Sequence, residues 1–217
     1  MVQVLNRGSN GAAPSERVRR KNGARRLDIL RAAARVFRRL GMSATGMREI
    51  AEEADLSPGN LYYYFSGKDE ILLFCQERTL ERLLAAVAKA RTAAGSYAER
   101  LRAVMRAHVH CMLDELEGAT AHLEIEALPE ELRAPVIRKR DAYERAVRAL
   151  VAKGIERGEF APADASLLTR AMLGALNWTA RWYRPEGPQS VAEIADSLSD
   201  YLVRGLAPAS PAAGARK

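Results

Sequence analysis

Apolar residues recur along most of the chain at the three- and four-residue spacing of amphipathic helices. No segment alternates apolar and polar residues as a half-buried strand does. Glycine, proline and serine–glutamate pairs at capping spacing mark the breaks. The pattern predicts nine helices, over residues 25–40, 47–54, 58–65, 66–94, 96–117, 119–127, from between 132 and 135 to 158, 165–183 and 190–205. We therefore expect an all-α protein.

Two of these helices are short and joined by a tight turn. Met47, Ile50, Ala51 and Ala54 form an apolar face on the first, and Asp55 ends that pattern. An aspartate tolerates the left-handed backbone that such a turn requires. The spacing is typical of a helix-turn-helix.

The second short helix has little core of its own. Ser57 and Pro58 suit its first turn, because serine accepts a hydrogen bond from backbone N–H groups and proline lacks an N–H. Leu61 and Phe65 are its clear core anchors, so the tyrosines at 62–64 crowd onto about two turns with little to bury them. A helix that presents hydroxyl groups in this way is suited to the major groove of DNA.

The positive charge of the chain is concentrated near its ends. The net charge is +7, and residues 1–26 alone carry seven basic residues against one acidic residue. The tail from Ala207 adds two basic residues, which leaves the intervening body nearly neutral. A basic arm beside a DNA-reading helix can contact phosphates or enter the minor groove. The alternative is a solvated tail that only aids solubility.

Composition sets further bounds. Hydrophobic residues make up 48% of the 217 residues, enough for a core, yet no apolar run approaches the length of about 18 residues that a membrane span requires. The N-terminus lacks the apolar block of a signal peptide, so we expect a soluble, cytoplasmic protein without a membrane partner. Cys75 and Cys111 lack metal-ligand spacing and suit helix packing; no motif indicates a metal or a cofactor.

The N-terminal motif resembles the TetR family of bacterial transcriptional regulators. The matching positions are Gly41, Arg48, Glu49, Ile50, Ala51, Ala54, Ser57, Pro58, Gly59, Leu61, Tyr62, Phe65, Lys68, Ile71 and Leu72. The resemblance implies a nine-helix TetR-like architecture, with a three-helix head before a helical bundle. It also implies a homodimeric repressor, not an enzyme, that binds a palindromic operator and whose ligand alters the spacing of the two heads.

The family's DNA contacts can be transferred to matching positions, although Gly46 replaces a hydroxyl cap and Asp55 replaces the turn glycine. The resulting DNA-binding candidates are Thr45, Arg48, Ser57, Gly59, Asn60, Tyr62, Tyr63, Tyr64 and Lys68. Asn60 can pair with adenine or cap its helix. Tyr63 and Tyr64 can reach phosphates or thymine methyls, whereas the ring of Tyr62 can instead pack inside.

The segments 174–185 and 190–195 are similar to a subgroup of the family that includes repressors of fatty-acid and steroid catabolism. That subgroup senses acyl-coenzyme A thioesters, so the resemblance implies an effector of this type. The candidates for the ligand pocket are His108, Met112, Arg138, Tyr143, Asn177, Trp178, Arg181 and Trp182. Arginine beside tryptophan suits an anionic ligand with a flat ring, although each residue can instead belong to the core.

We expect the dimer to form through the last two long helices. The candidates for the interface are Leu168, Met172, Leu173, Leu176, Ile194, Leu198, Tyr201 and Leu202, and some of them must be intrachain core. The predicted division of the chain is a disordered basic arm (1–22), a helix-turn-helix DNA-binding domain (23–67), a ligand-binding and dimerisation domain (68–206) and a flexible tail (207–217).

Two rival functions remain open. A sensor of lipophilic or cationic drugs would use carboxylates and aromatic rings, which Glu124, Glu126, Trp178 and Trp182 offer. An all-α enzyme would use His108 or His110 with Glu124 as acid and base, but no nucleophile motif, phosphate loop or metal signature accompanies them.

Overall fold

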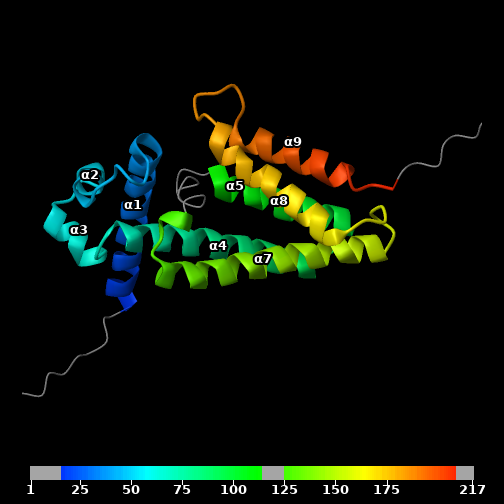
Figure 1. Cartoon of the computed structure of the whole chain (residues 1–217), viewed down its shortest axis with the longest axis horizontal. Helices are drawn as coiled ribbons and strands as arrows, with labels where there is room; N and C mark the ends of the chain where they lie inside the picture. Colours follow the sequence, from blue (N-terminus) through cyan, green and yellow to red (C-terminus); the bar gives the residue numbers. More distant parts are fainter. Residues whose placement is uncertain (1–15, 114–124, 209–217) are drawn as a thin grey trace, which may run out of the picture.

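The computed structural model describes residues 16–113 and 125–208, and the regular secondary structure in these ranges is all helical. The elements, named as in Figure 1, are α1 (Glu16–Leu40), α2 (Met47–Glu53), α3 (Pro58–Tyr64), α4 (Lys68–Thr92), α5 (Tyr97–Leu113), the 3₁₀ helix η1 (Ile125–Ala127), α7 (Glu130–Glu156), α8 (Ala165–Trp182) and α9 (Val191–Arg204). The predicted all-α class is confirmed. The helix predicted over 119–127 lies mainly outside the described residues, and its last three residues form η1.

Helix α1 is longer than predicted, because it begins at Glu16 rather than near Arg25. Residues 16–22, which we assigned to a disordered arm, are therefore helical. The exposed side chains in this stretch include Arg17, Arg20 and Lys21. A helical stretch of mainly charged residues shows no apolar periodicity, so the pattern of hydrophobic residues could not reveal it.

Helix α7 also starts earlier than predicted. We placed its start between Leu132 and Pro135, but it begins at Glu130 and continues through Pro135. Proline lacks the N–H that would bond to the carbonyl four residues earlier, yet a long helix with buried neighbours such as Val136 tolerates that loss.

The sequence predicts capping boxes of Ser66 with Asp69, Ser96 with Glu99 and Ser190 with Glu193, and the structure has the last two. The backbone N–H and the hydroxyl of Ser96 donate to the carboxylate of Glu99 at 2.8 and 3.0 Å, and residues 190–193 repeat this arrangement. Before α4 the partner differs by one position: the N–H of Ser66 donates to Glu70, at 2.7 Å, four residues on.

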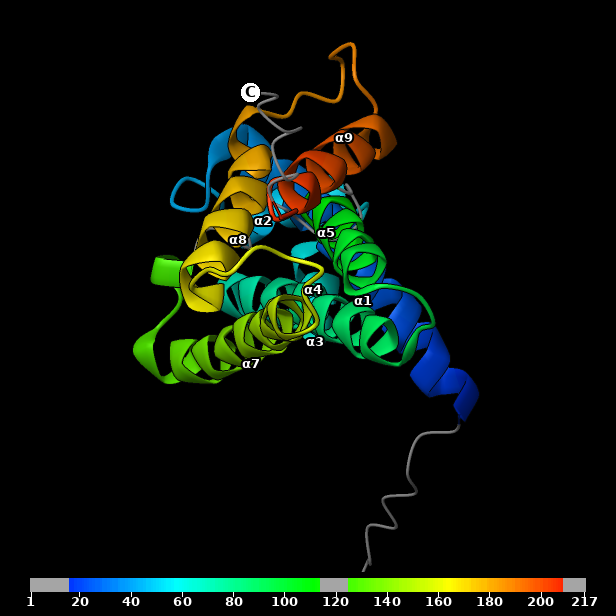
Figure 2. The ribbon, with the colours of Figure 1, turned by 90° about the vertical axis from the view of Figure 1, so that its right-hand side faces the viewer.

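The molecule consists of a small head, formed by α1–α3, and a larger bundle (Figure 1). Helix α4 runs from the head into the bundle. Helix α5 packs against α4, α7, α8 and α9. The view along the bundle in Figure 2 shows α5 between α9 and α4. The largest fully buried side chains of the head are Ile29, Leu30, Ile50, Leu61 and Phe65.

One arginine joins the head to the start of α4. The guanidinium of Arg26 lies 4.2 Å from the ring centre of Phe65 and 4.8 Å from that of Phe74, and it pairs with Glu70 at 3.1 Å. Burial alone would raise the pKa of Glu70, but the hydrogen bonds from Ser66 and the pair with Arg26 lower it below its ordinary value. The charged pair and the rings therefore hold α4 against the head.

Candidate DNA-reading head and effector pocket

The turn between α2 and α3 has the predicted backbone. Asp55 adopts a φ of 53°, in the left-handed region, so the expectation that aspartate replaces a turn glycine is confirmed. The guanidinium of Arg25 donates to the backbone carbonyls of Ala54 and Asp55, at 3.4 and 3.5 Å. These contacts hold the turn against α1.

The start of α3 also follows the sequence pattern. The N–H of Asn60 donates to the hydroxyl of Ser57 at 3.2 Å, and Pro58 occupies the first helical position. Leu61 and Phe65 are buried, as predicted. Since the cap is supplied by Ser57, the side chain of Asn60 is not required for it and stands exposed.

The outer surface of α3 carries two exposed tyrosines rather than three. Tyr62 is 55% exposed and Tyr63 is 73% exposed, and Gly59 before them is exposed too. Tyr64 is half-buried, and its ring meets that of Tyr63 edge-on at 5.0 Å. We considered that the ring of Tyr62 could pack inside, but Tyr62 is exposed and Tyr64 is the tyrosine whose ring packs inward.

Two of the DNA-binding candidates serve the loop between α1 and α2. Thr45 is buried, and its hydroxyl donates to the carbonyl of Gly41 at 2.7 Å. The ammonium of Lys68 donates to the carbonyls of Met42 and Thr45, at 3.1 and 3.0 Å. We withdraw the side chain of Thr45 as a phosphate contact, because it is covered and engaged. Lys68 connects the start of α4 to the head in this structure.

Arg48 stands on the outer side of α2. Its side chain is 81% exposed and pairs with Glu52 at 3.1 Å, an ion pair that solvent weakens. The guanidinium can therefore exchange this partner for a phosphate at little cost.

A cavity of about 230 Å³ lies in the bundle, with walls from α4, α5, α7 and α8. Its lining residues are Leu80, Leu83, His108, Arg140, Asp141, Tyr143, Glu144, Leu173 and Asn177. Two leucines of α4 and one of α8 supply its apolar walls. The cavity is the size of a small ligand. Part of its wall belongs to α4, the helix that leads to the head.

Three side chains from three helices form a polar network beside this cavity. The two ring nitrogens of His108 lie 3.0 Å from the Tyr143 hydroxyl and 3.1 Å from the Asn177 carbonyl oxygen. Because an amide oxygen only accepts, Nε2 of His108 donates to Asn177 and Nδ1 accepts from Tyr143. The amide N–H groups of Asn177 have no hydrogen-bond acceptor among the described residues.

Burial keeps this network uncharged. Desolvation lowers the pKa of His108 to about 4, against a smaller opposing effect of its hydrogen bond with Asn177. Burial raises the pKa of Tyr143 above its ordinary value. Histidine and tyrosine are therefore both neutral near pH 7, and the cavity meets a fixed set of donors and acceptors.

The structure brings together three of the eight predicted pocket residues, namely His108, Tyr143 and Asn177. Met112 is fully buried in the hydrophobic core. The four others are exposed and do not line this cavity: Arg138, Trp178, Arg181 and Trp182. Sequence reasoning missed the apolar walls, because leucines at helical spacing look the same in a core and in a pocket.

The predicted dimer residues divide among several environments. Met172, Leu176 and Ile194 are buried inside the chain, which corrects their assignment to a subunit interface. Leu173 lines the cavity instead. The half-buried ones are Leu168, Leu198 and Leu202. Tyr201 is 74% exposed and is the predicted interface residue that the chain itself leaves most open.

The exposed large apolar side chains of α8 lie on the side of this helix away from buried Met172 and Leu176. Leu167, Trp178 and Trp182 are 65%, 64% and 43% exposed, and Ala171 and Gly174 between them are exposed as well. Their spacing along α8 forms one stripe, because residues three, four, seven and eight positions apart share a helix face. This stripe is the part of α8 that the bundle leaves uncovered.

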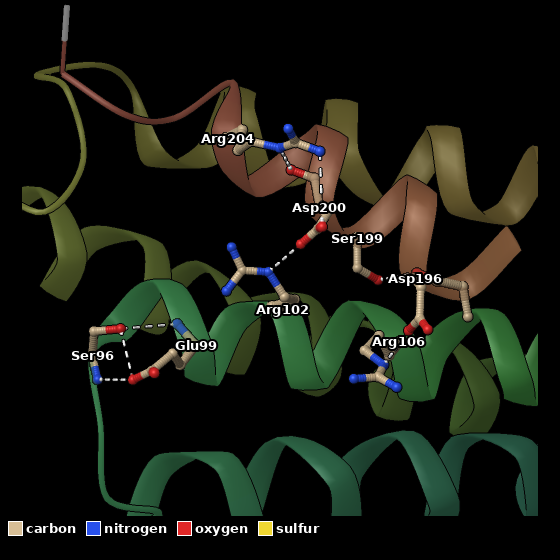
Figure 3. A network of polar contacts seen from close by, with 9 residues as sticks. Ser96, Glu99, Arg102, Arg106, Asp196, Ser199, Asp200 and Arg204 are labelled. Atoms are coloured by element: carbon tan, nitrogen blue, oxygen red, sulfur yellow. Dashed lines mark hydrogen bonds and ion pairs between the residues drawn. The ribbon is translucent and has the colours of Figure 1, made fainter. Parts of the chain in front are cut away.

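Ion pairs fix α9 on α5 (Figure 3). Arg102 lies 2.6 Å from Asp200, and Arg106 lies 2.7 Å from Asp196. The buried hydroxyl of Ser199 donates to the carbonyl of Ala195 at 2.6 Å. Helix α9 is thereby oriented with Tyr201 outward.

Two features of the described residues bear on other classes of protein. Among residues 16–113 and 125–208, none of the helices combines the length and apolar character needed to cross a bilayer. In the same ranges, no three histidine, cysteine or acidic side chains gather in a way that could hold a metal ion.

A three-helix head with an exposed reading helix, continuous through α4 with a bundle that holds a half-open pocket, defines a ligand-responsive helix-turn-helix regulator. Residues 29–74 match the family described as "Bacterial regulatory proteins, tetR family", and residues 94–206 match "Tetracyclin repressor-like, C-terminal domain". The chain therefore belongs to the TetR family of transcriptional regulators.

Known relatives extend over most of the chain. The HTH-type transcriptional repressor KstR2 of Mycobacterium tuberculosis is 26% identical over 194 residues, which are 88% of this chain and 97% of that protein. The crystal structure of the TetR family regulator PfmR from Thermus thermophilus is 36% identical and covers 83% of this chain and 99% of PfmR, with a TM-score of 0.74. AibR in complex with isovaleryl coenzyme A and operator DNA shares the fold, at 24% identity over 85% of this chain and 98% of AibR, with a TM-score of 0.70.

Proposed function

We propose that the chain is a homodimeric repressor that binds a palindromic operator and leaves it when an acyl-coenzyme A thioester enters the cavity. The observation that carries the effector assignment is the polar network of His108, Tyr143 and Asn177 beside leucine walls. Convergent polar groups beside apolar walls in a concave pocket are typical of a small-molecule site. The proposal also places the protein in the cytoplasm, with the DNA, and gives it no enzymatic activity.

The contacts to DNA come from the exposed parts of α2 and α3. Asn60 and Gly59 approach base edges, because a free amide can bond to two positions of an adenine in the major groove. Tyr63 contacts phosphates or thymine methyls, whereas Arg48 and the hydroxyl of Tyr62 contact phosphates. Tyr64, Ser57 and Lys68 support the head instead. The ring of Tyr64 packs on that of Tyr63, the hydroxyl of Ser57 caps α3, and the ammonium of Lys68 binds the loop between α1 and α2.

Two heads are needed for specific binding, and the exposed faces of α8 and α9 support a dimer. Leu167, Trp178, Trp182 and Tyr201 expose large apolar surfaces there. Ala171 and Gly174 would allow the helices of two chains to approach closely. A palindromic site follows from twofold symmetry, because each head then meets an equivalent half-site.

The effector assignment rests on hydrogen-bond complementarity. The amide N–H groups of half-buried Asn177, which face the pocket, can donate to the carbonyl oxygen of a thioester. The leucine walls suit an acyl chain, and the half-buried guanidinium of Arg140 suits the phosphates of coenzyme A. Relatives support this class: one related structure, AibR, is a complex with isovaleryl coenzyme A.

Helix α4 supplies the path from the cavity to the head. Leu80 and Leu83 of α4 line the cavity, while Lys68 and Glu70 at its other end hold the head. A ligand that displaces the leucine walls therefore shifts α4 and changes the separation of the two reading heads. Only a ligand that prefers one position of α4 can cause this shift.

A sensor of lipophilic cations is the second candidate, and Asp141 and Glu144 at the cavity favour it. The groups that we first considered for that role lie elsewhere: Trp178 and Trp182 are exposed, and Glu126 pairs with Arg133 at 2.8 Å. Glu124 lies outside the described residues. Of the two histidines considered for the enzyme alternative, His108 has both ring nitrogens engaged, and His110 is exposed and does not line the cavity.

A selection experiment tests both halves of the proposal. We expect the full-length protein to select a palindrome from a random DNA pool and to bind it less tightly as salt rises. Isovaleryl coenzyme A or another acyl thioester should then release the selected duplex. Release by a lipophilic cation such as tetraphenylphosphonium, but by no thioester, would establish the drug-sensor alternative. Failure to select any duplex would overturn the regulator itself.

A further inference from the structure

The size of the cavity restricts the acyl group that it can hold. Its volume is about 230 Å³. A cavity of about 150 Å³ accommodates benzene, so by proportion this one holds about nine non-hydrogen atoms. We propose, on the basis of the proposed function, that the pocket is selective for a short acyl group of no more than about eight carbons and excludes the fused rings of a steroid.

The position of the polar groups indicates how such an acyl group lies. His108 and Tyr143 are 2% and 4% exposed and mark the inner end of the cavity, whereas Asn177 and Arg140 are half-buried and stand nearer its mouth. The thioester carbonyl accepts from the amide of Asn177. The coenzyme A moiety then points outward past Arg140, and the acyl tail points inward.

The inner end can close on an apolar tail because its polar groups satisfy one another. The hydroxyl of Tyr143 donates to His108, and His108 donates to Asn177. Covering His108 and Tyr143 with hydrocarbon leaves neither of their donors without an acceptor. The same closed network stops a longer tail, because its atoms belong to three helices that also pack on one another.

Leu173 sets the length of acyl chain that the cavity can hold. It is half-buried on α8 and lines the cavity, whereas Leu80 and Leu83 on α4 are almost fully buried. Shortening Leu173 enlarges the cavity by the three carbons that it loses. Replacing Leu173 with a larger ring fills the cavity instead.

The test is a chain-length series of saturated acyl-coenzyme A thioesters from two to sixteen carbons, with a steroid-acid thioester added. Binding is measured by calorimetry on the full-length dimer without DNA, and release is measured on its operator. We expect affinity to rise by about fourfold per methylene up to no more than about eight carbons, and then to fall. Equal or tighter binding of the sixteen-carbon or steroid thioester would overturn the size limit.

Matched variants distinguish a length filter from a general loss of binding. Leu173→Ala should move the optimum to chains about three carbons longer. Leu173→Phe should move it to shorter chains. Ile155→Ala, a truncation at the far end of α7 that does not line the cavity, should leave the optimum in place. An unchanged optimum in both Leu173 variants would overturn the assignment.

Free carboxylic acids of the same lengths separate the two possible sources of the acyl group. Binding of the free acid alone, with the same length limit, would keep the short-acyl pocket but remove coenzyme A from the proposed function. The absence of binding by every thioester and every acid would overturn the effector class, whereas binding without a length limit would overturn this inference alone.

Discussion

The hydroxyl of Tyr143 on α7 lies 3.0 Å from Nδ1 of His108 on α5, and it fixes the tautomer of a buried, neutral histidine. The two helices are thereby linked across a cavity whose opposite walls belong to α4 and α8. This buried polar contact is costly to break, because Nδ1 of His108 and the hydroxyl of Tyr143 would each lose a hydrogen-bond partner away from water.

Stability should depend on pH through His108. Its pKa in the folded chain is about 4, below the ordinary value of 6.5, so the unfolded chain binds the proton first. The contribution of the neutral ring is complete above about pH 6.5 and is lost as the pH falls towards 4. We expect urea unfolding of the protein to lose about 3 kcal/mol between pH 7 and pH 4 through this residue. The His108→Gln variant should lack that part of the slope; an identical slope would show that His108 is not the group responsible.

Asn60 should set preference at one operator position. Asn60→Ala should cost about 1–3 kcal/mol on the preferred operator and relax discrimination at a single base pair. Arg48→Ala is the comparison, because a lost phosphate contact weakens binding to all sequences about equally and lowers the salt slope by about one. Fluorescence titrations against single-base operator variants measure both. If Asn60→Ala binds more weakly but discriminates as before, Asn60 does not contact a base.

Lys68 should act on the head rather than on the phosphates. Its ammonium holds the carbonyls of Met42 and Thr45, so Lys68→Met leaves two acceptors of the loop without this donor. We expect operator binding to weaken by about 1–3 kcal/mol with an unchanged salt slope, and effector binding to be retained. A salt slope that falls by about one would instead identify Lys68 as a phosphate contact.

The exposed stripe of α8 should hold the dimer together. Trp178 is 64% exposed in the single chain, and Trp178→Arg places a charge in the middle of the proposed interface. We expect monomers in sedimentation velocity and a loss of tight operator binding, with helical content preserved. Ile137→Arg is the control, since Ile137 is 42% exposed on α7, away from this stripe. A Trp178→Arg protein that remains dimeric would place the interface elsewhere.

Sequence reasoning succeeded where the signal is local. The turn at Asp55, the cap at Ser57 and the box of Ser96 with Glu99 are each determined by residues within four positions of one another. It failed at the start of α1, because charged and exposed residues such as Arg17, Arg20 and Lys21 give no apolar stripe to detect.

Which way each hydrophobic side chain of a helix faces could be decided only from the packed helices. Met172 and Leu176 look like interface residues from their spacing, yet they are buried in the chain, and Trp178 on the same helix is exposed. Periodicity shows that α8 has an apolar face but not which neighbour covers it. Leu173, predicted for the interface, lines the cavity for the same reason.

The sequence alone determined the helices, the helix-turn-helix and the resemblance to a family of regulators, because caps, turns and helical faces depend on near neighbours along the chain. Only the tertiary structure decided the pocket. His108 meets Tyr143 across 35 positions and Asn177 across 69 positions, and contacts at that separation arise when helices pack, not from the pattern within any one of them.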